Sequence, residues 1–125
     1  MKWNMKWKIQ SKIKDVIKEW EDREGQKITE AETIKLYGIL PPLEKIDPGF
    51  LSQMKKCRYF SMSTNNIEKI PNLTGMSSLE ILSLGRNQIK RIENMDGVAD
   101  TLRQLWISYN QIDKLNGLEK LKKLQ

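Results

Sequence analysis

The chain has 125 residues and a net charge of +6 at pH 7, with 22 Lys and Arg against 16 Asp and Glu. It contains no histidine and one cysteine, Cys57, which excludes a histidine general base, a His-containing metal site and a cage of thiolates. No G-x-x-x-x-G-K-[ST] phosphate loop occurs either, so we expect a protein that is not an enzyme and has no cofactor.

The basic charge favours an acidic partner, but charge alone does not identify one. Nucleic acid, an anionic membrane and an acidic protein surface all fit. A lysine-rich face that is simply solvated explains the composition equally well.

Residues 1–10, MKWNMKWKIQ, form a basic leader in which Trp3 and Trp7 have the spacing of one helix face. Three interpretations stay open: a lipid- or partner-facing arm, a disordered leader, or an artefact of a predicted start. We favour the last two. Polar residues interrupt any apolar run here, so we expect no secretory signal and no membrane span.

An N-terminal cap is expected over residues 11–56, beginning with a helix. Ser11 is a candidate N-cap and Gly25 a C-terminal stop. The helix has one apolar stripe, which we expect to cover the first repeat: Ile13, Val16, Ile17 and Trp20.

The rest of the cap combines a capping box, a strand and a turn. Thr29 and Glu32 fit the T-x-x-E box, and Ile34 and Leu36 alternate as a degenerate first strand would. Asp47-Pro48-Gly49 predicts a turn. Further inward-facing residues are expected at Leu43, Ile46, Leu51 and Met54.

Residues 57–125 repeat the motif L-x-x-L-x-L-x-x-N-x-I three times, from Cys57, Leu79 and Leu102, at intervals of 22 and 23 residues. This period, with Asn at the ninth place, is typical of leucine-rich repeats. A fourth repeat starts at Leu124 and is cut off. We therefore predict an α/β fold: a leucine-rich-repeat solenoid of 22-residue repeats with a short parallel sheet and an N-terminal capping helix.

Each place in the motif has a mechanical role. Places four and six alternate as in a strand with one buried face, and the Asn at place nine can bond peptide groups where the chain leaves the strand. The strand core is expected at Phe60, Met62, Leu82, Leu84, Leu105 and Ile107, the asparagine ladder at Asn65, Asn87 and Asn110, and the return side at Ile70, Leu73, Met76, Ile92, Met95, Val98, Leu115, Leu118 and Leu121.

Cys57 occupies a core place, so we interpret it as a small buried hydrophobe rather than a nucleophile. Extracellular repeat proteins of this kind are usually capped by disulfides, which one cysteine cannot form, so we expect an intracellular, soluble protein. The last coil has no polar cover after Leu121, which suggests either a truncated protein or an edge that a partner covers.

The outward residues of the sheet are the candidate binding surface. Trp106 is the most informative, because an exposed indole is costly unless a partner covers it, and Trp, Tyr and Arg dominate binding hot spots. The alternative is that Trp106 only leans on Ser83 and Tyr109 across the sheet. The candidate partner-binding residues are Ser61, Ser63, Ser83, Arg86, Gln104, Trp106, Ser108 and Tyr109.

The segments PPLEKID, STNNIEKI, LSLGRN and LWISYN are more specific than the generic repeat, because they fix variable places as well. From about Ile13 to Gln125 the chain resembles the axonemal outer-arm dynein light chains of the leucine-rich-repeat type. The resemblance implies a non-catalytic subunit of the ciliary axoneme, within the cytoplasm and cytoskeleton. It also implies binding to a dynein heavy chain at its microtubule-binding domain, with tubulin close by, and neither nucleic acid nor membrane as partner.

Two other classes of protein share features with this sequence. A regulatory subunit of a protein phosphatase can be built from the same repeat, but would require a longer array than three coils. An RNA-associated splicing subunit is supported only by the basic leader with Trp3 and Trp7.

Overall fold

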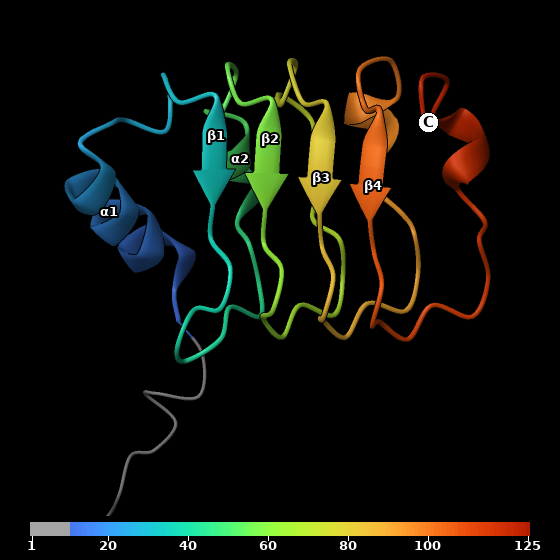
Figure 1. The fold of residues 1–125 in the computed structure, drawn as a ribbon, viewed down its shortest axis with the longest axis horizontal. Coiled ribbons are helices and arrows are strands. Elements are labelled where there is room, and N and C mark those ends of the chain that lie inside the picture. The colour runs from blue at the N-terminus through green and yellow to red at the C-terminus, as the bar shows by residue number, and fades with distance from the viewer. Residues whose placement is uncertain (1–10) are drawn as a thin grey trace, which may run out of the picture.

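The computed structural model describes residues 11–125, so the predictions for the leader, residues 1–10, lie outside the described part. Four short parallel strands lie side by side, with the longest helix beside the first strand (Figure 1). None of the helices in residues 11–125 is long and apolar enough to cross a membrane. The elements are α1 (Ile13–Glu24), β1 (Thr33–Lys35), α2 (Pro48–Leu51), β2 (Tyr59–Ser61), β3 (Ile81–Ser83), η2 (Asp96–Val98), β4 (Gln104–Trp106) and η3 (Leu118–Lys120).

The strands follow one another in the order β1-β2-β3-β4, and equal places of the motif pair across the sheet. Phe60 is the register partner of Leu82, which in turn pairs with Leu105. On the other side Phe60 pairs with Ile34, so the degenerate first strand expected in the cap is β1. The prediction of an α/β fold with a short parallel sheet and an N-terminal helix is therefore confirmed.

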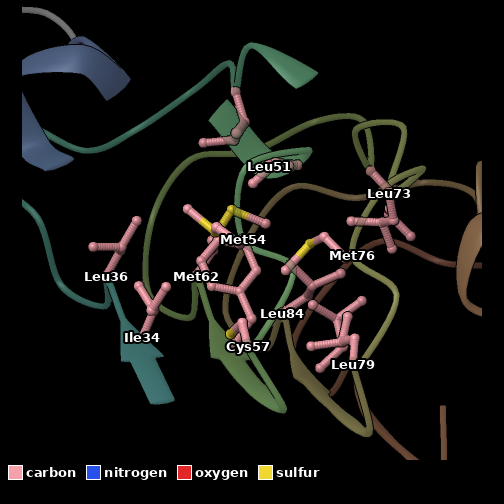
Figure 2. Close-up of a cluster of buried hydrophobic side chains, with 14 of the residues drawn as sticks. Ile34, Leu36, Leu51, Met54, Cys57, Met62, Leu73, Met76, Leu79 and Leu84 are labelled. Carbon is pink, nitrogen blue, oxygen red and sulfur yellow. The ribbon is translucent and has the colours of Figure 1, made fainter. Parts of the chain in front are cut away.

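The core consists of residues that return at fixed places of each repeat. Figure 2 shows side chains from the strands and the residues directly after them, such as Ile34 and Met62, gathered with side chains from the return segments, such as Met54 and Met76. All four are no more than 1% exposed. Burying apolar surface contributes roughly 25 cal/mol for each Å², so this core is the main source of stability.

The asparagines at place nine hold the turns that leave the strands. The Asn87 side chain is only 3% exposed. It accepts a bond from the Ile67 N–H at 3.0 Å and donates to the carbonyls of Met62 and Leu84 at 3.0 Å. The same pattern recurs at Asn65 and Asn110. Each carboxamide therefore ties its own repeat to the preceding one.

Helix α1 forms as its apolar stripe predicts, but its N-cap differs. Gly25 ends the helix in the left-handed conformation, at φ 66, with its N–H donating to the Glu21 carbonyl. The expectation that Ser11 caps the helix is wrong, because Lys12 is the N-cap residue. The Ser11 hydroxyl instead donates to the Pro41 carbonyl at 2.6 Å, which fastens the start of the helix to a later part of the cap.

Two local predictions in the cap are also wrong. No helix follows Thr29, and the carbonyl of Glu32 accepts bonds from the N–H groups of Arg58 and Tyr59, so this segment enters the sheet instead. Asp47 does not start a simple turn. Its side chain accepts from the Gly49 N–H at 2.8 Å and caps the one-turn helix α2.

The burial of the repeats decreases toward β4. Leu105 and Ile107 are only partly buried, although the equivalent residues of the two preceding repeats are fully buried. Leu115 is 66% exposed, so its expected place in the core is wrong. The equivalent Ile92 is 6% exposed, and the Gly117 backbone packs closely against its carbonyl. Within residues 11–125 no further repeat covers Leu115 in that way.

Burial also determines how reactive the thiol of Cys57 is. Cys57 is fully buried, and this burial raises the pKa of its thiol from 9.0 to about 12, opposed by hydrogen bonds with the backbone of Ile34 and Tyr59. At about pH 8 the native thiol should react with a disulfide reagent at least a hundredfold more slowly than in denaturant, because the thiolate is the nucleophile. Stopped-flow absorbance measures both rates, and equal rates would contradict the burial of Cys57.

The asparagine ladder makes a second prediction. Replacing Asn87→Ala leaves the buried Ile67 N–H without its acceptor, while the carbonyls of Met62 and Leu84 keep their second donors, the amides of Asn65 and Asn110. The free energy of unfolding should therefore fall by about 2 kcal/mol. Urea denaturation followed by circular dichroism measures this loss. Asn116→Ala, at an exposed asparagine on the return side, is the control and should change stability little.

Candidate functional site

The strand face around β4 carries two large exposed aromatic side chains. Trp106 is 58% exposed and Tyr109 is 73% exposed. Trp106 is the register partner of Ser83 on β3, but the small serine leaves more than half of the indole accessible to solvent. Leaning across the sheet therefore does not cover this side chain. The indole N–H donates to the Gln104 side-chain oxygen at 3.3 Å.

Arg86 and Tyr109 occupy place eight of successive repeats and stack on each other. The Arg86 guanidinium carbon lies 4.4 Å from the centre of the Tyr109 ring, in cation–π contact. Among residues 11–125 Arg86 has no ion-pair partner. The stack therefore holds the guanidinium at the surface, where a carboxylate of another molecule can reach it.

The backbone helps to place these side chains. Arg86 and Tyr109 have φ values of 56 and 60, in the left-handed region, and Thr64 at the same place has φ 57. This conformation costs on the order of 1 kcal/mol for a residue other than glycine. Because it returns in each repeat, the turn that leads to the inward asparagine imposes it.

The serines form a hydrogen-bonded floor beside the aromatic residues. The hydroxyls of Ser63 and Ser83 lie 2.6 Å apart, and the Ser61 hydroxyl donates to that of Ser63 at 3.3 Å. Ser61 was expected at the surface, but it is only 5% exposed. It lies between Lys35 and Ser83, its register partners on the two neighbouring strands, and its hydroxyl holds that of Ser63 in place by a hydrogen bond.

The expected residues thus come together on the strand face, apart from the buried Ser61. Gln104 and Ser108 are exposed beside Trp106, and Ser63 and Ser83 are partly exposed. The surface combines flat aromatic groups, one guanidinium and small hydroxyls, which suits contact with a protein surface. Among residues 11–125 no group of three or more His, Cys, Asp and Glu side chains could hold a metal ion.

A charged ladder that the sequence did not predict lies at the entrance to the strands. It borders a cleft of 590 Å³. The Arg58 side chain lies 2.7 Å from Glu80 and 3.7 Å from Glu32, and Arg103 lies 3.7 Å from Glu80. The hydrogen bond from Arg58 is the main cause that lowers the pKa of Glu80.

These four residues all stand at place two of their repeats. The alternation of sign at equal places was the signal that would have revealed the ladder. Because its charges pair with one another, the ladder joins neighbouring strands and leaves little unpaired charge for a ligand.

Comparison with known proteins identifies similar chains. The chain is 58% identical over 96 residues to dynein axonemal light chain 1 of Chlamydomonas reinhardtii. It is 50% identical over 94 residues to the protein of that name from Danio rerio and 51% identical over 92 residues to that of Homo sapiens.

These alignments cover 77%, 75% and 74% of this chain, and 48% of each relative. The chain thus spans about half the length of the curated relatives that it matches. No model of a protein family matches it.

The two described tryptophans provide a matched test of burial. Trp20 is 3% exposed, so Trp20→Ala should lower the free energy of unfolding by about 3–5 kcal/mol. Trp106→Ala removes a side chain that is mostly in solvent and should cost less than about 1 kcal/mol. Urea denaturation followed by circular dichroism compares the two variants. A loss at Trp106 as large as at Trp20 would mean that Trp106 is held for stability rather than for binding.

Proposed function

Because the chain belongs to the dynein axonemal light chain 1 family, we propose that it is a non-catalytic light chain of an axonemal outer-arm dynein. In this proposal it binds the dynein heavy chain at or near its microtubule-binding domain and modulates how that domain engages the microtubule. The family is one of axonemal dynein components, which places the chain in the axoneme of cilia and the cytoskeleton.

The proposal includes a leucine-rich-repeat solenoid as the scaffold. Its support is the return of the same contacts in successive repeats: equal places pair across the sheet, and asparagines at place nine join each repeat to the preceding one. Such a scaffold can hold an outward surface rigidly, because the hydrogen bonds of the strands and turns are made within the protein.

The observation that carries the proposal is the exposed indole of Trp106 beside the stacked Arg86 and Tyr109. Trp106 and Tyr109 act as anchors that a heavy-chain surface covers. Arg86 pairs with a carboxylate of that surface, and the floor around Ser63 and Ser83 allows close approach. Aromatic and Arg side chains commonly supply most of the free energy of binding at such interfaces.

The proposed mechanism is steric and electrostatic. Motor chemistry belongs to the heavy chain, and the light chain contributes a rigid body with a net charge of +6 beside a small domain. On an acidic microtubule lattice this charge favours close approach of tubulin, and its contribution weakens as salt increases. The light chain thereby alters how the microtubule-binding domain sits on the lattice.

A pull-down with recombinant microtubule-binding domains of axonemal dynein heavy chains tests the proposal. The double variant Arg86→Ala, Trp106→Ala should bind at least about a hundredfold more weakly than the unchanged protein, since two hot-spot side chains typically contribute 2 kcal/mol or more each. Titration by fluorescence anisotropy gives the dissociation constants.

The matched control is Leu40→Ala, Arg91→Ala, which removes an exposed apolar side chain and an exposed cation outside the strand face. It should bind as the unchanged protein does. Equal binding by both double variants would show that the strand face is not the site. No binding by the unchanged protein to any of the domains would refute the proposed partner.

A further inference from the structure

A second surface lies at the opposite end of the sheet from Trp106, between α1 and the edge strand β1. It is a groove of 620 Å³. One wall consists of residues in β1 and directly after it, among them Thr33, Lys35 and Tyr37. The other wall consists of residues of α1, such as Arg23 and Glu24. Figure 1 shows α1 at this end of the sheet, beside β1.

Two carbonyl groups at this edge, those of Lys35 and Tyr37, accept no hydrogen bond from the rest of residues 11–125. In the interior of the sheet, the carbonyls at places five and seven accept hydrogen bonds from N–H groups of the preceding repeat. The Ser83 carbonyl accepts from the Met62 N–H and the Gly85 carbonyl from the Thr64 N–H, both at 2.9 Å. The equivalent carbonyls of β1 and the residues after it belong to Lys35 and Tyr37. No strand precedes β1 in the described part of the chain, so no repeat supplies their donors.

The N–H groups follow the same rule. At place three, the Ile81 N–H donates to the Arg58 carbonyl of the preceding repeat, and the Tyr59 N–H donates to the Glu32 carbonyl. Thr33 is the register partner of Tyr59, so its N–H points away from β2 and into the groove. The edge therefore offers donors and acceptors at the spacing of a β-strand.

These unpaired N–H and carbonyl groups determine which kind of ligand fits the groove. A helix pairs its backbone groups internally and cannot satisfy an open strand edge, whereas an extended peptide can. The side chains add a charge preference. On the α1 wall Arg23 and Glu24 pair with each other at 3.3 Å, whereas Lys35 has no ion-pair partner within residues 11–125. Its ammonium lies 5.2 Å from the centre of the Tyr59 ring on β2, and a carboxylate in the groove would give this flexible side chain an ion-pair partner. Tyr37, which is 63% exposed, adds an aromatic contact beside it.

A second copy of this chain is a poorer occupant. Pairing β1 with β1 of another copy would bring two Lys35 side chains into one short ladder of three residues per strand. Like charges across a ladder destabilise it. An extended segment with a carboxylate side chain near Lys35 has the complementary charge.

We propose that the groove between α1 and β1 binds an extended, acidic segment of a partner protein, which adds a strand to the sheet at β1. This surface is separate from the strand face around Trp106, so the inference goes beyond the proposed function and does not depend on it. A light chain with both surfaces can hold two segments at once.

The probe is a synthetic peptide of alternating valine and glutamate, titrated into the isotopically labelled protein and followed by amide NMR. The largest shifts should fall on Thr33, Lys35 and the residues after β1, with those around Trp106 unchanged. A peptide with alternate amides N-methylated has the same side chains but lacks half of its donors. Losing such bonds should weaken its binding by about tenfold or more.

The protein variants test the same contact from the other side. Thr33→Pro removes the edge N–H and leaves the bonds of β1 to β2, so it should also weaken binding by about tenfold, whereas Thr33→Val keeps the N–H and should not. Thermal unfolding checks that both variants fold. Lys35→Glu should weaken binding, and Lys45→Glu, at an exposed lysine elsewhere, is its charge control.

Equal binding of the N-methylated and unmodified peptides would overturn the proposal, as would shifts centred on Trp106. If Thr33→Pro does not fold, the N-methylated peptide with the unchanged protein decides the outcome. Dimerisation of the protein through β1 that competes with the peptide would assign the groove to a second copy and would also overturn the proposal.

Discussion

The fold depends on pairing backbone groups at the points where the chain leaves each strand. The strands have only three residues, so much of the backbone near the core lies in turns whose peptide groups have no ladder partners. A carboxamide solves this problem because it donates and accepts at once. Asn87 accepts from one repeat and donates to two, and its nearly complete burial makes each of these bonds difficult for water to replace.

This constraint determines what is left for function. Apolar residues and asparagines occupy the inward places, so only the outward places of the strand and the turn can vary without disturbing the core. The turn itself then positions two of the outward groups: the left-handed backbone at Arg86 and Tyr109 lets them stack across neighbouring repeats. The arrangement of the candidate site is therefore a consequence of the same turn that buries the asparagine.

The periodic parts of the molecule could be predicted from sequence, since burial at place four of one repeat implies burial at place four of the next. The exposure of Trp106 followed from the same alternation. Predictions failed where a contact distant in sequence competes with a local rule. Ser11 could cap a helix, but its hydroxyl bonds the Pro41 carbonyl, and Ser61 alternates outward yet is buried between the strands on either side. Leu115 fits the repeat but lacks the covering residues that Ile92 has.

The groove beside β1 could not be predicted from the sequence, for a related reason. No motif marks an open strand edge, because the edge is defined by the backbone of Thr33, Lys35 and Tyr37 and by the position of α1 relative to it. The helix buries its apolar stripe, including Trp20, and so caps the core without pairing with the strand. A helix can cover side chains but cannot satisfy the hydrogen bonds of a sheet edge. Capping this sheet with a helix therefore closes its core while leaving its first strand able to accept another.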